Sequence, residues 1–233
     1  MTPNAAALKP HGFFVTGTDT AVGKTLIACA LLHAFAARGL RVVGMKPVAA
    51  GAQFVKGAWL NDDVEQLIAA STVSAPREMV NPYCFERPIA PHIAANMNKN
   101  TIKIRQLRHS YQQLSALAEV VIVEGVGGFA VPLNDHETSA DLAQQLGLPV
   151  LMVVGMRLGC LNHALLTAEV VRARGLTLAG WIANHIEPQM QHADANVDTL
   201  ATKLEAPLLG RIAFSAHPDS AAIARQIDLS ALL

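Results

Sequence analysis

The chain has 233 residues, enough to bury a full hydrophobic core as one domain. Hydrophobic residues make up 52% of it and charged residues only 15%, a balance that favours an α/β protein with a buried parallel sheet. Eighteen basic residues balance eighteen acidic ones, which argues against a nucleic-acid or anionic-membrane partner, and no apolar run is long enough to cross a bilayer.

Cysteine usage and the N-terminus indicate a cellular compartment. Cys29, Cys84 and Cys160 are odd in number, far apart and without metal-ligand spacing, so we expect reduced thiols in a cytoplasmic protein. The first residues lack a basic segment followed by an apolar one, so they do not predict a signal peptide. We expect a flexible N-terminal extension over residues 1–11 and a single domain over residues 12–233.

Strand-like apolar runs alternate with helical patterns along the chain. Strands are expected at residues 13–16, 42–46, 120–124, 150–154, 179–183 and 208–213. Helices are expected at residues 25–38, 62–70, 101–117, 139–146 and 161–173. This alternation predicts right-handed β-α-β units and a mostly parallel sheet covered by helices on both faces. The widest gap between strands, from 46 to 119, is rich in proline and should build loops over the carboxyl edge of the sheet, where ligands bind.

The first strand leads into the most informative segment, which ends in Gly23-Lys24-Thr25 and opens into a helix. Glycine lets backbone N–H groups approach phosphate oxygens, and a helix N-terminus adds partial positive charge. Lys24 would reach the terminal phosphates, and the Thr25 hydroxyl would contact a magnesium ion. Five residues separate Gly17 from Gly23, where the usual P-loop has four. A plain strand–turn–helix with a surface lysine is the alternative interpretation.

Charged residues follow the other strands at the same predicted edge. Glu124 ends a strand, where it could hold magnesium or simply be solvated. Asp62 and Asp63 open a helix. One of them is explained by the helix dipole, and the other could complete a hard-cation site with Thr25 and Glu124. Lys46, fixed by the following proline, could face bound phosphate or be a surface lysine. We expect Lys46 to matter for chemistry more than for folding.

Two further positions lie at strand ends. The helix that starts near residues 159–162 presents unpaired N–H groups, which bind carboxylates well. His163 in its first turn could be a catalytic base, although a structural role is more common there. The amide of Asn184, at the end of a strand, could pair with a purine edge or cap a turn.

Seven sequence motifs follow one another along the chain: GTDTAVGKT (17–25), GMKPVAAG (44–51), NPYCF (81–85), APH (90–92), VEGVGG (123–128), RLGCLNHALLT (157–167) and GWIAN (180–184). Together they resemble the motifs of the dethiobiotin synthetase family, and the resemblance covers nearly everything from residue 13 to the C-terminus. The motif GTDTAVGKT is far more specific than a general P-loop, and it explains the extra loop residue.

The resemblance implies a three-layer P-loop NTPase fold with about seven strands and a homodimer with its active site at the subunit interface. It also implies a reaction of 7,8-diaminononanoate, CO2 and MgATP. An amine would capture CO2 as a carbamate, ATP would phosphorylate the carbamate, and the second amine would close the ring. Protein groups would then supply mainly positioning and charge neutralisation.

The resemblance also assigns residues. Lys24 and Lys46 would be catalytic, and Thr25, Asp63 and Glu124 would hold magnesium. Nucleotide binding would involve Ala21, Val22, Gly23, Lys24, Thr25, Leu26, Asp63, Glu124, Gly125, Val126, Gly127, Asn184, Ala213, Phe214 and Ser215. Substrate binding would involve Thr20, Lys46 and Ala50, with Gly159, Cys160, Leu161 and Asn162 of the partner subunit at the substrate carboxylate.

Five positions depart from the family pattern, so fewer contacts with the diamine and with adenine are expected. Ala50 and Ala90 replace serines, His185 replaces aspartate, Ala213 replaces proline and Asn196 replaces a tyrosine. Three alternatives remain: a paralogous enzyme with a related substrate, a P-loop ATPase switch, and a regulatory subunit without catalysis. The switch is disfavoured because such proteins carry a lysine at the position of Asp19. The regulatory subunit is disfavoured by the full set of phosphate- and metal-type residues.

Overall fold

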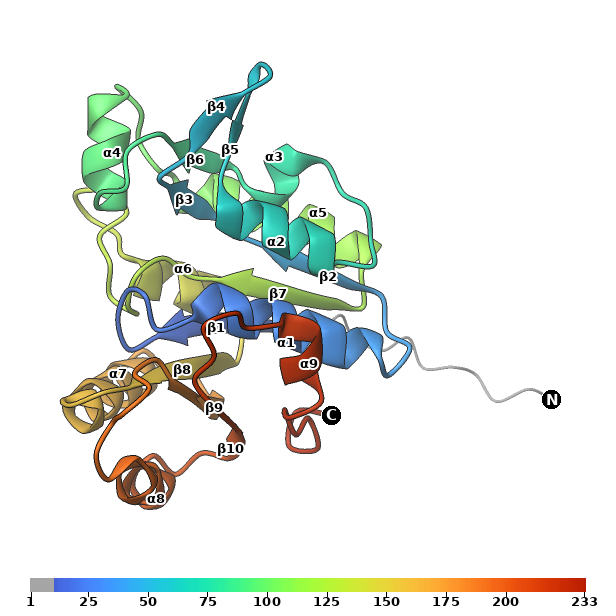
Figure 1. Cartoon of the computed structure of the whole chain (residues 1–233). Coiled ribbons are helices and arrows are strands. Elements are labelled where there is room, and N and C mark those ends of the chain that lie inside the picture. Colours follow the sequence, from blue (N-terminus) through green and yellow to red (C-terminus); the bar gives the residue numbers. More distant parts are fainter. Residues whose placement is uncertain (1–10) are drawn as a thin grey trace.

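The computed structural model describes residues 11–233, and a parallel sheet forms its centre (Figure 1). Six strands pair in the order β10-β9-β8-β1-β7-β2, and every pairing is parallel. Their bounds are β1 (His11–Gly17), β2 (Val42–Met45), β7 (Val120–Glu124), β8 (Val150–Met156), β9 (Leu178–His185) and β10 (Leu208–Ile212). The extension expected over residues 1–11 lies outside the described residues, except for His11 at the start of β1.

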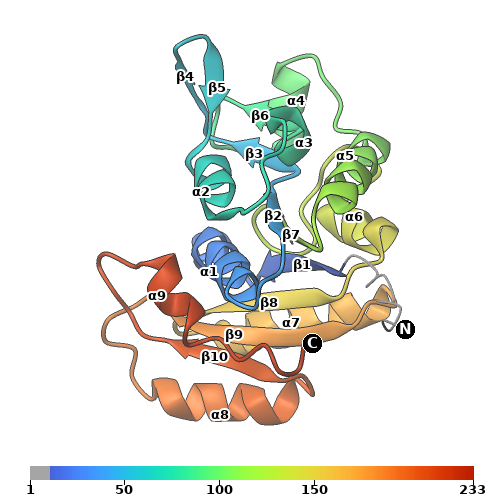
Figure 2. The ribbon, with the colours of Figure 1, turned by 90° about the vertical axis from the view of Figure 1, so that its right-hand side faces the viewer.

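Helices cover both faces of this sheet, as Figures 1 and 2 show. One hydrophobic core lies between the sheet and the helices α1 (Lys24–Ala36), α2 (Asp62–Ala70) and α9 (Ser220–Ala224). The other core lies against α5 (Ile104–Leu117), α6 (Ser139–Leu146), α7 (Cys160–Ala173) and α8 (Ala193–Lys203). β7 and β8 are buried along their whole length, as expected for parallel strands with helices on each side. The three-layer α/β fold is therefore confirmed.

Every strand and helix expected from the sequence is present, with ends that differ by up to three residues. The long segment between β2 and α5 contains more structure than expected. It forms β3 (Val48–Ala50), β4 (Gln53–Val55), β5 (Ala58–Leu60), α3 (Arg77–Val80), β6 (Tyr83–Phe85) and α4 (Pro91–Met97). Figure 1 shows these elements gathered beyond the β2 edge of the sheet. α8 and α9 were also not anticipated.

The main sheet has six strands where the resemblance implied about seven, and Pro47 accounts for the difference. Proline has no N–H to donate to a ladder, so the chain breaks after β2 and resumes as β3. β3 then pairs in parallel with β6 as a separate two-stranded sheet. Asn81 joins the two parts, because its amide donates to the carbonyls of Lys46, at 2.6 Å, and Tyr83, at 3.0 Å.

Within residues 11–233, no helix combines the length and the apolar character that crossing a bilayer requires. The carboxyl ends of β1, β2, β7 and β8 meet at one edge of the sheet, and the loops that follow them come together there. This edge holds the candidate site.

Candidate functional site

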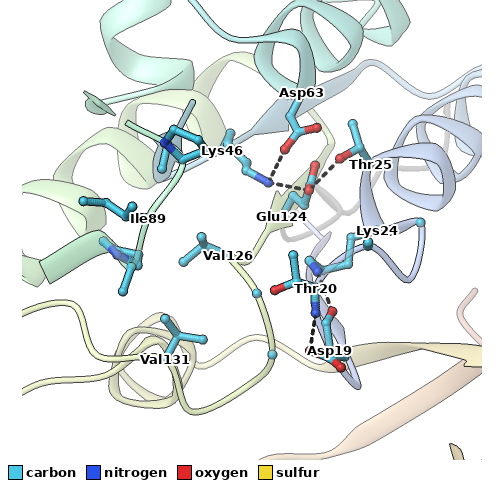
Figure 3. A pocket seen from close by; sticks show the side chains of 18 residues that line it. Asp19, Thr20, Lys24, Thr25, Lys46, Asp63, Ile89, Glu124, Val126 and Val131 are labelled. Carbon is cyan, nitrogen blue, oxygen red and sulfur yellow. Dashed lines mark hydrogen bonds and ion pairs between the residues drawn. The ribbon is translucent and has the colours of Figure 1, made fainter. Parts of the chain in front are cut away.

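A cleft of about 760 Å³ opens at the carboxyl edge of the sheet, between the loop after β1 and the segments after β2, β6 and β7 (Figure 3). It is lined by Asp19, Thr20, Ala21, Gly23, Lys24, Thr25, Lys46, Ala50, Asp63, Pro88, Ile89, Ala90, Pro91, Glu124, Val126, Gly127, Gly128 and Val131. Residues that are far apart in the sequence thus share one cavity because parallel strands end together.

The loop between β1 and α1 is fixed by packing beneath it. The side chain of Val22 is 1% exposed. A Cβ on Gly17 or Gly155 would lie 2.6 or 2.7 Å from a methyl group of Val22, so both positions require glycine. The amide of Asn184 also donates to the carbonyl of Val22, at 2.8 Å. Gly23 has φ 87°, a left-handed conformation that turns the chain into the start of α1.

Lys24 lies at the start of α1 with its ammonium over this loop, where it donates to the carbonyl of Asp19 at 2.9 Å. Burial and the nearby charge of Lys46 lower the pKa of Lys24 to about 8. A neutral carbonyl is a weak partner for a buried ammonium. Lys24 is therefore a cation whose charge the protein alone stabilises poorly, and an anion in the cleft would improve its environment.

Lys46 is held much more firmly. Its Nζ lies 2.5 Å from Oε1 of Glu124 and 2.8 Å from Oδ2 of Asp63 (Figure 3). Burial opposes the charged form, but Glu124 and Asp63 outweigh it and raise the pKa of Lys46 above its usual value. Burial likewise opposes ionisation of Asp63, yet the charge and hydrogen bond of Lys46 keep its pKa low. Burial raises the pKa of Glu124 above its usual value, and the charge of Lys46 opposes that shift. The cluster therefore places a cation between two carboxyl groups.

Glu124 has one oxygen free for another ligand. Its Oε1 accepts hydrogen bonds from Lys46 and, at 2.9 Å, from the hydroxyl of Thr25. Its Oε2 is buried and has no hydrogen-bond partner among the described residues. Residues 11–233 contain no group of three or more His, Cys, Asp or Glu that could hold a metal. Two carboxylates and a hydroxyl nevertheless form a donor set that suits a hard cation such as magnesium, which needs few protein oxygens.

The two acids at the start of α2 differ in position. Asp63 lines the cleft and contacts Lys46, whereas Asp62 is exposed and lies outside the cleft lining. Asn61 fixes this arrangement. Its side chain accepts the N–H of Asp63 as the helix N-cap and donates to the carbonyl of Ala50, each at 3.2 Å. Of the two acids, the structure therefore places Asp63 in the cleft and Asp62 outside it. The metal role of Asp63 stays a prediction.

Many of the residues predicted for nucleotide or substrate lie in the cleft, and others do not. The lining includes Thr20, Ala21, Gly23, Lys24, Thr25, Lys46, Ala50, Asp63, Glu124, Val126 and Gly127. Outside the lining are Val22, Leu26, Gly125, Asn184, Ala213, Phe214, Ser215 and the turn of Gly159, Cys160, Leu161 and Asn162. The Asn184 amide uses one N–H on the loop itself, so its predicted contact with adenine would use the second N–H or the carbonyl oxygen.

Sequence reasoning missed several residues that shape the site. Asp19, Pro88, Ile89, Pro91, Gly128 and Val131 line the cleft, while Asn61, Asn81 and Arg157 hold its loops in place. The proline-rich gap contains Asn61, Asn81, Pro88, Ile89 and Pro91 and predicted loops over this edge without indicating which side chains face inward. The quoted motifs contain Asp19, Gly128 and Arg157 but likewise do not indicate their contacts.

Comparison with known proteins agrees with this geometry. A family model described as an AAA domain matches residues 11–220. The protein named ATP-dependent dethiobiotin synthetase BioD from Aromatoleum aromaticum is 53% identical over 95% of this chain and 98% of its own length. The protein of the same name from Nitrosospira multiformis is 54% identical over 94% and 95%. Among solved structures, the MinD cell division protein of Aquifex aeolicus matches with a TM-score of 0.55 and 15% identity, covering 88% of this chain and 83% of that one. That similarity concerns the fold alone.

The burial of Lys46 changes the expectation that this residue matters for chemistry more than for folding. Lys46→Met should lower the free energy of unfolding by about 3–5 kcal/mol at pH 8, because it leaves Glu124 buried without its counter-charge. The loss should shrink toward pH 5, since a protonated Glu124 needs no counter-charge. Urea denaturation at the two pH values measures both effects.

Two further variants serve as controls for this experiment. Adding Glu124→Gln to Lys46→Met should restore much of the stability, because no buried charge remains. Lys24→Met should cost less stability than Lys46→Met, since a carbonyl is the one hydrogen-bond partner of Lys24 within residues 11–233. Wild-type stability of Lys46→Met would contradict the buried ion cluster.

Proposed function

The chain belongs to the family of ATP-dependent dethiobiotin synthetases, and from this membership we propose how its cleft performs the reaction. It is an ATP-dependent ligase that forms dethiobiotin. The observation that carries the proposed mechanism is the pair Lys24 and Lys46 in one cleft, beside Thr25, Asp63 and Glu124. The family relationship does not favour a paralogous enzyme or an ATPase switch.

The substrates of the proposed reaction are 7,8-diaminononanoate, CO2 and ATP. One amine attacks CO2, loses a proton and forms a carbamate. A carbamate oxygen then attacks the γ-phosphorus of ATP, and ADP leaves. The second amine attacks the carbonyl carbon of the resulting carbamic-phosphoric anhydride and loses a proton, and phosphate departs with the former carbamate oxygen as the ureido ring closes. Negative charge concentrates on the transferred phosphoryl group, so positioned cations stabilise the transition state.

The two lysines have different parts in this scheme. Lys24 faces the phosphates, whose charge would favour its ammonium form and draw it from the carbonyl of Asp19. Lys46 keeps its charge because Glu124 and Asp63 surround it, so it would face the carbamate and the phosphoryl group as a preorganised cation. Ala50 and Thr20 in the same lining would contact the diamine.

A magnesium ion would be held by Thr25, Asp63 and Glu124. Two observations support this set: Oε2 of Glu124 has no hydrogen-bond partner in the described part of the chain, and the carboxylate of Asp63 is partly exposed. When bound, the ion would neutralise phosphate charge and help to orient ATP. The adenine end of ATP would lie toward Asn184 and residues 213–215, beyond the cleft lining.

The functional unit we propose is a homodimer with a shared active site. The turn of Gly159, Cys160, Leu161 and Asn162 lies outside the cleft of its own chain. Leu158, directly before it, is 96% exposed. The N–H groups of the turn at residues 159–162 would therefore bind the substrate carboxylate in the partner's cleft. A cytoplasmic location is supported by the free thiols of Cys29, Cys84 and Cys160.

The function is tested by following ADP release and dethiobiotin formation together. Both should require diaminononanoate and bicarbonate as well as ATP, because the phosphoryl acceptor forms only from amine and CO2. Omission of either substrate should leave only slow background hydrolysis. Equal ADP release without the diamine would contradict the proposed reaction and favour a plain ATPase.

The metal assignment is tested by titrating activity with magnesium. Asp63→Asn should raise the magnesium concentration needed for half-maximal activity by about tenfold or more, because it removes one of few protein ligands. Asp62→Asn is the matched control one residue away and should behave like wild type, since Asp62 is exposed outside the cleft. Equal effects of the two substitutions would contradict the assignment.

The shared site is tested by mixing two inactive variants. Lys24→Met damages the phosphate site, and Gly159→Val damages the turn, because a β-branched residue tolerates the φ of 94° at Gly159 poorly. Random pairing of equal amounts should restore about a quarter of wild-type activity, since half of the dimers would carry one intact site. Absence of rescue despite proven subunit exchange would place the whole site within one chain.

A further inference from the structure

An ion pair joins the P-loop to the start of α7. Nη2 of Arg157 contacts Oδ2 of Asp19 across 138 positions of sequence. Asp19 lies in the loop after β1, and Arg157 directly follows β8, the strand that pairs with β1. Neither the phosphate motif nor the metal set uses this contact.

Asp19 is connected to both functional neighbours in its loop. Its main-chain oxygen accepts the ammonium of Lys24 at 2.9 Å, and its Oδ1 accepts the N–H of Thr20 at 2.7 Å. The Thr20 N–H and the charge of Arg157 lower the pKa of Asp19, so its carboxylate is ionised at neutral pH. A displacement of Asp19 therefore moves Lys24, which faces the phosphates, and Thr20, which faces the substrate, at the same time.

Arg157 is equally tied to the turn that precedes α7. Its carbonyl accepts the N–H of Cys160 at 3.0 Å, and Gly159 between them holds a φ of 94°. Because this hydrogen bond closes a tight turn, a shift of the start of α7 also shifts the backbone of Arg157. The segment 157–162 thus contacts the P-loop of its own chain through the side chain of Arg157, and it presents backbone N–H groups to a ligand at the start of α7.

We propose that Arg157 is a positioning residue that couples nucleotide binding in one protomer to substrate-carboxylate binding in the partner's cleft. The inference rests on the proposed function, which gives residues 159–162 to the partner's substrate. A bound carboxylate orders the turn, the ordered turn fixes Arg157, and Arg157 fixes Asp19 and the loop around the phosphates. Linkage makes the effect reciprocal, so nucleotide also favours substrate in the opposite site.

The expected coupling is modest. The two side chains are 36% and 43% exposed, and partly exposed ion pairs contribute little on their own. A coupling factor on the order of twofold to fivefold is therefore expected. Loss of the pair should leave the melting temperature almost unchanged, which separates positioning from a structural role.

The coupling can be measured by calorimetric titration of the full-length protein with a non-hydrolysable β,γ-methylene analogue of ATP. Its Kd is determined with and without saturating diaminononanoate, in the absence of bicarbonate. In the wild type the diamine should tighten analogue binding by the stated factor. Arg157→Gln should bring the factor close to one, and Arg157→Lys, which keeps the charge, should retain part of it.

Two further variants sharpen the result. Asp19→Asn keeps an oxygen for the Thr20 N–H but removes the charge, so it should lose the coupling, and the double variant with Arg157→Gln should lose no more. Arg174→Gln is the matched control. Arg174 follows the last residue of α7, forms an ion pair with Asp141 of α6, and has a side chain about as exposed as that of Arg157. Arg174→Gln should leave the factor unchanged.

A wild-type factor of one, or an unchanged factor in Arg157→Gln, would overturn the coupling role. Failure of the proposed function is recognised separately, because the wild type would then form no dethiobiotin from diaminononanoate, bicarbonate and ATP. Turnover of the diamine together with an unchanged factor in Arg157→Gln contradicts only this inference.

Discussion

The burial of one ammonium group determines the architecture of the cleft. Lys46 is 4% exposed, and a lysine removed from water in this way needs carboxylates within hydrogen-bond distance. Glu124 meets that need from the end of β7, and Asp63 meets it from the first turn of α2. The chain after β2 must therefore return over the sheet edge, and Asn61 and Asn81 fix the backbone on either side of that return.

This constraint also prepares the site for its chemistry. Because Lys46 is already desolvated and oriented, little reorganisation is needed when negative charge develops on a phosphoryl group. Lys24 differs, since its partner is a single carbonyl and its pKa is lowered to about 8. The cleft thus combines one cation that the protein holds firmly with another that it leaves for the substrate to stabilise.

Local chemistry made part of this predictable from the sequence. Gly23, Lys24 and Thr25 at a strand–helix junction, and Glu124 at a strand end, indicate a phosphate and cation site by their own residue types. Contacts between distant segments were not predictable in this way. The pairing of Arg157 with Asp19 has no local pattern, and the separate β3–β6 pair beyond Pro47 depends on tertiary hydrogen bonds from Asn81.

Phosphoryl transfer to a carbamate in this cleft leaves a trace in the path of one oxygen atom. Bicarbonate labelled with ¹⁸O is mixed with the enzyme, diaminononanoate and ATP, and the released phosphate is analysed by mass spectrometry before the label exchanges with water. One ¹⁸O atom is expected in each phosphate, because ring closure expels phosphate with the carbamate oxygen. Phosphate that carries oxygen from water instead would contradict phosphoryl transfer to a carbamate.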